Sequence, residues 1–127
     1  MAKFDNALDV EKINLTNNEG RGTWRLCKPL VYESDVLNAV VQVPAGFETD
    51  FASVPRIPIV FDILGDRGDL AGVVHDYLYD KECTLSIDRK TADKVLKEAL
   101  IAQGVSSWMA WVMYLGVRIG ASSHFRK

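Results

Sequence analysis

Hydrophobic and polar residues alternate along the first third of the chain, with the period of a half-buried β-strand. Apolar positions recur about every second residue in 9–15 and 23–27, and β-branched or aromatic residues fill 30–32 and 39–43. The polar stretch at 34–38 separates the last two segments, so we expect a hairpin there. These patterns predict a small antiparallel β-sheet before residue 48.

The period changes to that of an α-helix after Pro58. Apolar residues spaced by three and four predict three helices: one with an apolar stripe over 70–78, one over 86–103, and one that is capped at 106 or 107 and runs to about 119. Asp69 can cap the first, and Gly104 can end the second. The third is apolar nearly all round, so we expect it to be the most buried helix, with Trp108, Trp111 and Tyr114 packed in the core rather than lining a ligand site.

The two patterns together predict an α+β fold, with an N-terminal antiparallel β-sheet followed by three C-terminal α-helices. A chain of 127 residues with 48% hydrophobic content suits a single domain over 1–127. The longest apolar run, 108–117, is far shorter than the roughly 20 residues that a membrane span requires. We therefore expect no membrane span.

The net charge of −2 and the sequence pI of about 5.6 lack the basic footprint of a general nucleic-acid binder. A polyanionic substrate would have to be met by a few placed cations, such as Arg56 and Arg89.

The chain has two cysteines, Cys27 and Cys83, and its first residues lack the apolar region of a signal peptide. We expect a reducing compartment and two free thiols. Cys27 lies in an alternating segment, where a buried cysteine acts as a small hydrophobe rather than as the nucleophile of a thiol hydrolase.

Two segments, 49–56 and 75–79, break the apolar patterns with acids, a base and hydrogen-bond donors. Asp50 is either a turn residue or a site residue, and Ser53 and Arg56 follow it at +3 and +6. In the second interpretation Asp50 is catalytic, while Ser53 and Arg56 bind substrate.

His75 and Asp76 form an adjacent doublet of the kind that binds divalent metal ions, with Tyr79 one turn after His75. A lone histidine on a helix is more often structural. The only other histidine is His124, so a phosphohydrolase site that needs several histidines is excluded. We take His75 and Asp76 as catalytic candidates, Tyr79 as a substrate-binding candidate, and His75, Asp76 and Asp50 as ligands of a divalent ion.

Asp93 shares a helical line with Arg89, one turn before it, and with Leu96 and Leu100 after it. One interpretation is an exposed Arg89–Asp93 pair, which would leave Arg89 a substrate-binding candidate with little effect on stability. The other turns Asp93 inward to face His75 or Arg56, as a fourth catalytic candidate, because a charge on an apolar line requires a buried partner. The apolar line favours the inward interpretation.

These residues belong to blocks that occur in a fixed order: 43–47 (VPAGF), 49–50 (TD), 52–56 (ASVPR), 75–79 (HDYLY), Arg89 with Ala92 and Asp93, and Tyr114 with Val117, Arg118 and Gly120. With them, the chain resembles a mainly bacteriophage and prophage family that is catalogued as a domain of unknown function. The resemblance covers roughly 22–120, and residues 121–125 fit it less closely. It implies a viral origin and a shared polar cluster, but no reaction.

Two classes of function follow. In the first, the cluster is the site of a metal-assisted hydrolase that acts on a cell-wall bond or a phosphoester. In the second, the protein is a virion component or binds phage structural or host proteins, and the cluster is a buried hydrogen-bond network. Either class places the protein in the host cytoplasm or in the virion. A cluster open to solvent would favour the enzyme, and a sealed one the structural role.

Overall fold

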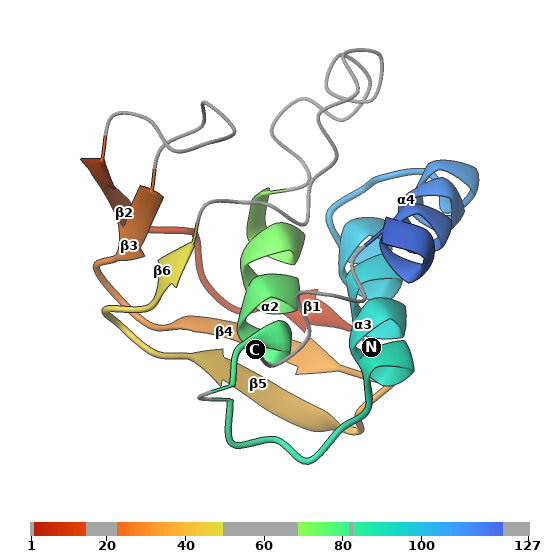
Figure 1. Cartoon of the computed structure of the whole chain (residues 1–127), viewed down its shortest axis with the longest axis horizontal. Helices are drawn as coiled ribbons and strands as arrows, with labels where there is room; N and C mark the ends of the chain where they lie inside the picture. The colour runs from red at the N-terminus through yellow and green to blue at the C-terminus, as the bar shows by residue number, and fades with distance from the viewer. Residues whose placement is uncertain (1, 15–22, 50–68, 82, 121–127) are drawn as a thin grey trace.

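The computed structural model describes residues 2–14, 23–49, 69–81 and 83–120. Within them, strands precede helices, as the sequence patterns predicted, so the α+β class is confirmed (Figure 1). The elements are β1 (Lys3–Phe4), β2 (Val10–Asn14), β3 (Thr23–Leu26), β4 (Leu30–Ser34), β5 (Ala39–Val43), β6 (Glu48–Thr49), α2 (Asp69–Tyr79), α3 (Arg89–Ala102) and α4 (Ser107–Gly120).

The strands form two small antiparallel sheets, ordered β1-β4-β5 and β2-β3-β6. The expected hairpin is β4–β5, which pairs Leu30 with Val43 and Ser34 with Ala39. Its turn places Asn38 at φ 50°, a conformation that asparagine tolerates well. Along β5, Val41 and Val43 are fully buried, whereas Val40, which precedes Val41 in the same strand, is exposed, as strand alternation requires.

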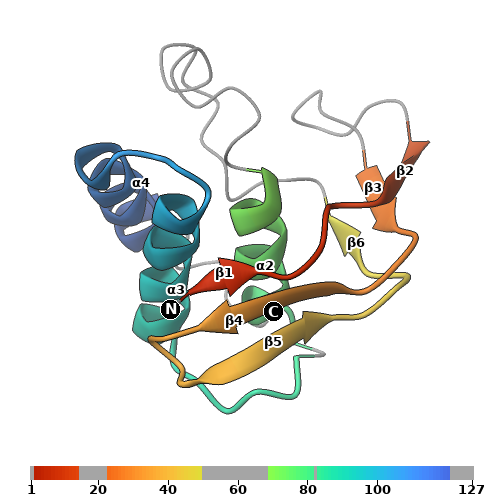
Figure 2. The ribbon, with the colours of Figure 1, turned by 180° about the vertical axis from the view of Figure 1, so that it is seen from behind.

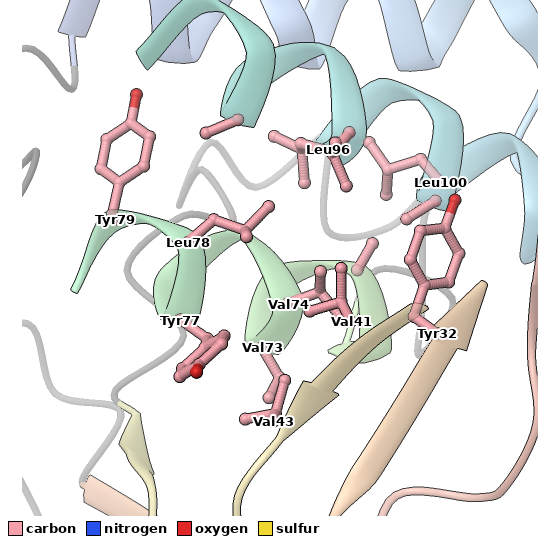
Figure 3. Packing of buried hydrophobic residues seen from close by; sticks show 14 of the residues in the cluster. Tyr32, Val41, Val43, Val73, Val74, Tyr77, Leu78, Tyr79, Leu96 and Leu100 are labelled. Atoms are coloured by element: carbon pink, nitrogen blue, oxygen red, sulfur yellow. The ribbon is translucent and has the colours of Figure 1, made fainter. Parts of the chain in front are cut away.

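Helix α2 lies between the β4–β5 hairpin and α3, with buried side chains on both sides (Figures 1 and 3). Figure 3 shows Val73 beside Val43 of β5, while Leu78 points toward Leu96 of α3. A side chain of α3 also caps α2, because Gln103 Oε1 accepts a hydrogen bond from the Ala71 amide at 2.9 Å. These contacts fix the orientation of α2 relative to α3.

Helix α3 has clear signals at both ends. Asp88 Oδ1 accepts a 2.8 Å hydrogen bond from the Thr91 amide, which caps the N-terminus. Gly104, at φ +93°, follows the C-terminus, and this confirms the predicted stop.

Helix α4 is not the most buried helix, so that prediction is wrong. It packs against α3 at the outer side of the molecule, away from α2 and both sheets (Figures 1 and 2). Trp108 and Trp111 are exposed rather than in the core, and only the face of α4 that contains Met113 and Tyr114 is covered. The most enclosed helix is α2, because it has packed neighbours on two sides.

The placement of Cys27 also differs from expectation. Strand β3 ends at Leu26, and Cys27 is exposed, so it does not fill the core. Cys83 is buried, and neither thiol forms a disulfide. No helix of the described residues has the length and apolar character needed to cross a bilayer.

Candidate functional site

Asp93 of α3 is the centre of a buried polar network that joins the three helices. Its side chain is fully buried and accepts hydrogen bonds from His75 and Tyr79 of α2 and from Arg118 of α4. Asp93 Oδ1 lies 2.8 Å from His75 Nε2 and 2.5 Å from the Tyr79 hydroxyl, and Oδ2 lies 3.0 Å from a terminal nitrogen of Arg118. We call these four residues the Asp93 network.

The inward interpretation of Asp93 is therefore the one that the structure adopts, with His75 as the partner. The helical line through Leu96 and Leu100 turns this face of α3 toward α2, and both leucines are buried there. His75 is fully buried as well, and its ring lies 4.3 Å from the Tyr79 ring, centre to centre.

Opposing effects set the ionisation of the network. Burial raises the pKa of Asp93, but hydrogen bonds from His75, Tyr79 and Arg118 outweigh it and hold the pKa below its usual value. The same contacts act on the donors. Burial and then the Asp93 carboxylate raise the pKa of Tyr79, and the hydrogen bond to Asp93 raises that of Arg118. Asp93 is thus held as a carboxylate.

Arg118 is the network residue to which sequence reasoning gave no role. It is the only charged residue of α4, so a lone cation in an apolar helix was the available signal. The backbone carbonyl of Arg118 accepts a 2.5 Å hydrogen bond from Arg89. Arg89 therefore does not form the exposed pair with Asp93 that was the alternative interpretation of the sequence. The Arg89 Nε is buried and has no hydrogen-bond partner among the described residues, so Arg89 has capacity there to bind an anion.

Asp76 marks a second polar contact, next to His75 on α2. It is half-buried and accepts a short hydrogen bond from the hydroxyl of Thr49, the last residue of β6. The predicted polar segment 49–56 therefore begins against α2, one residue from His75. Asp50, Ser53 and Arg56 lie outside the described residues, and their approach to His75 remains a prediction.

Tyr79 was expected to contact substrate. Its hydroxyl donates to Asp93 instead, and the side chain is buried, so its evident effect is to position the carboxylate.

The predicted metal site is only partly covered by the described residues. Among those, no three His, Cys, Asp or Glu side chains lie close enough to hold a metal ion. His75 and Asp76 are adjacent, but Asp50, the third expected ligand, is not described. The metal set of His75, Asp76 and Asp50 stays a prediction.

Comparison with known proteins gives one match. A family model described as "Protein of unknown function (DUF1353)" matches residues 24–117, from β3 through most of α4. The match includes His75, Tyr79 and Asp93 and ends one residue before Arg118. No curated protein and no solved structure matches the chain.

Proposed function

The chain belongs to the DUF1353 family of proteins of unknown function, and we propose that it is a phage-encoded hydrolase in which His75 activates a water molecule. One observation carries the proposal: His75 Nε2 lies 2.8 Å from the Asp93 carboxylate, which is held as an anion. A carboxylate that orients an imidazole and stabilises its protonated form is the arrangement that general-base catalysis uses.

We assign the roles as follows. Nε2 is hydrogen-bonded to Asp93, so we assign to Nδ1 the task of taking a proton from water. The water oxygen then bonds to the carbonyl carbon or the phosphorus of an ester, and the bond to the leaving oxygen breaks. The proton held by His75 passes to that leaving oxygen, so no further reactant is needed.

The same nitrogen cannot both take a proton and bind a cation. We therefore assign the divalent ion to Asp76 and Asp50 rather than to His75. The ion would polarise the scissile ester, and Ser53, Arg56 and Arg89 would bind the anionic part of the substrate. The buried Nε of Arg89 without a partner supports this role for Arg89.

A structural need explains the Asp93 network poorly. Replacing a buried ion pair with apolar side chains is often neutral or stabilising, so packing alone does not require four polar groups between three helices. Polar groups with perturbed pKa values that cluster in this way are characteristic of functional sites.

A second candidate is a virion or host-interaction protein in which the network only fixes the helices. The burial of His75 and Asp93 favours it, because neither side chain is exposed and both Asp93 oxygens are engaged. Under this alternative the partners are phage structural or host proteins.

The test is hydrolysis of a carboxylic ester, a phosphodiester and purified cell wall, with and without divalent ions and after chelation. His75→Ala should lower activity by about 10²–10⁴-fold and leave folding intact, because Asp93 keeps Tyr79 and Arg118. His124→Ala is the matched control and should retain activity. Because His75 is fully buried in the structure, its modification by diethyl pyrocarbonate in the native wild-type protein would show that the site opens to solvent, as hydrolysis requires.

The opposite pattern supports the second candidate. An inactive wild-type protein, a protected His75 and a loss of about 3–5 kcal/mol in His75→Ala, the usual cost of breaking a buried pair, would together refute the hydrolase.

A further inference from the structure

Helix α4 presents an apolar stripe to solvent, although its opposite face is packed on α3. The stripe follows helical spacing and includes the most exposed hydrophobic side chain of the described residues, Ile119 at 83%, together with Trp108 at 61%. Its members, which we call the α4 stripe, are Trp108, Trp111, Val112, Leu115 and Ile119. An exposed apolar patch of this kind marks a binding surface.

A row of lysines on α3 borders the α4 stripe. Lys90, Lys94 and Lys97 are spaced by four and three residues, so they share one side of the helix. The Lys97 Nζ lies 4.8 Å from the centre of the Trp111 ring, which joins the row to the stripe. Asp93 lies one turn before Lys97 on α3, yet it contacts Arg118, which comes after Trp111 on α4. The two helices therefore run in opposite directions, and the lysine row follows the length of α4.

The positive charge of this surface is not neutralised by its own helices. Residues 88–120 contain five basic and three acidic side chains, whereas the whole chain has a net charge of −2. Asp93 and Glu98 are engaged by internal donors, and Asp88, which caps α3, is the one acid whose charge acts on Lys94. The lysine row therefore faces solvent beside an apolar stripe.

We propose that the α4 stripe and the lysine row bind the surface of an anionic lipid bilayer. Tryptophan and aliphatic side chains on one face, with lysines beside them, are typical of helices that lie at the boundary between headgroups and acyl chains. Each lysine near such a surface adds attraction to anionic headgroups. With 14 residues, α4 is about 21 Å long, which suits a helix lying in the plane of the interface.

A second copy of the chain fits this surface less well. Two-fold association through the α4 stripe would place the same patch on both subunits face to face, and a two-fold axis that crosses α4 would also bring the two lysine rows together. Like charges at such a contact repel one another, whereas an anionic bilayer complements them.

The surface also suggests a substrate class, an extension that rests on the proposed function. Arg118 connects α4 to Asp93, so the helix that would lie on the bilayer also forms part of the His75 site. The ester bonds of anionic membrane lipids are then the first substrates to test.

The experiment measures cosedimentation and tryptophan emission of the full chain with vesicles of phosphatidylcholine alone or mixed with phosphatidylglycerol. The wild-type protein should bind the mixed vesicles, bind neutral vesicles at least about tenfold more weakly, and be released by salt. Trp108→Ser with Ile119→Ser, and separately Lys94→Glu with Lys97→Glu, should each lower binding at least about tenfold. Val40→Ser on β5 is the control, because Val40 is also exposed and apolar but belongs to neither the α4 stripe nor the lysine row, and it should bind as the wild type does.

Several results would overturn the proposal: no vesicle binding by the wild type, equal binding to neutral vesicles, or unchanged binding in the stripe variants. A dimer that the stripe variants convert to monomer would assign the stripe to a second copy instead. His75→Ala separates the two proposals, since it should bind vesicles normally but release no fatty acid or phosphate. If the wild type binds vesicles without hydrolysing their lipids, the surface stands and the lipid-hydrolase extension fails.

Discussion

Helix α3 contains two carboxylates, Asp93 and Glu98, that each accept three hydrogen bonds but from different kinds of donor. Glu98 is half-buried and binds neutral groups of the β4–β5 hairpin: the hydroxyls of Tyr32 at 2.7 Å and Ser34 at 2.8 Å, and the Val36 amide at 2.8 Å. Asp93 is fully buried, and two of its donors, His75 and Arg118, are ionisable bases.

The difference separates a structural contact from a candidate reactive one. The Glu98 contacts tie the hairpin to α3, and that connection accounts for all three donors. The Asp93 contacts also connect elements, but hydroxyl and amide donors could do so without a histidine and an arginine. The Asp93 network has the additional property that its donors include groups whose charge proton transfer can change. The hydroxyl and amide donors of Glu98 lack this property.

The largest expected effect on stability is that of removing each carboxylate. Asp93→Ala should lower the free energy of unfolding by about 3–5 kcal/mol, as for a broken buried pair. We expect this loss to lie near the lower figure, because Arg118 is partly exposed. Glu98→Ala should cost about 1–3 kcal/mol, since it leaves only neutral donors unsatisfied. Urea unfolding of both variants measures the difference. Equal losses would mean that the two carboxylates are equivalent structural contacts.

The acid dependence of stability should sharpen the same contrast. The folded pKa of Asp93 is below its unfolded value, so its contribution is present above pH of about 4 and is lost as pH falls through the folded pKa. The difference in unfolding free energy between wild type and Asp93→Asn should therefore shrink as pH decreases from 5 toward and below about 4. Asp88, whose pKa is also lowered by its cap contact with Thr91, affects both proteins alike and cancels. A difference that stays constant with pH would contradict the ionised state of Asp93.

The two carboxylates also show what the sequence could and could not predict. The inward position of Asp93 was predictable, because Leu96 and Leu100 continue its line and a buried charge needs a partner. The role of Glu98 was not, since on α3 it resembles an ordinary surface glutamate and its partner Tyr32 is 66 residues away. A periodic pattern gives the face of a helix but not the distant segment that meets it.

The wrong prediction that α4 is the most buried helix has a related cause. Apolar residues all round a helix indicate that both faces avoid water, but the pattern does not say whether the second face meets the protein or another partner. For α2 the second face meets the hairpin, while the α4 stripe is exposed to solvent. The segment 50–56 lies outside the described residues, so the roles of Asp50, Ser53 and Arg56 stay predictions.

The smallest expected effect comes from a matched pair of tyrosines. Tyr79 donates to Asp93 and Tyr32 donates to Glu98, each through its hydroxyl, and burial raises the pKa of both. Tyr79→Phe and Tyr32→Phe each remove one hydrogen bond, so each should lower the free energy of unfolding by only about 1 kcal/mol. Because folding keeps both phenols protonated, each tyrosine contributes stability below pH of about 10 that is lost at higher pH, and each variant should lose part of that alkaline dependence.

Catalysis should distinguish the two tyrosines where stability does not. If Asp93 positions His75 as a base, losing the Tyr79 hydroxyl strengthens the remaining interaction between Asp93 and the protonated imidazole. The pH–rate profile should then change in Tyr79→Phe and remain in place in Tyr32→Phe, because Glu98 contacts no residue of the Asp93 network among the hydrogen bonds of the described chain. Rate measurements across pH on the most active ester substrate would test this, with chemical unfolding as the control for folding. Identical profiles for the two variants would show that the Asp93 network, like that of Glu98, only holds the fold together.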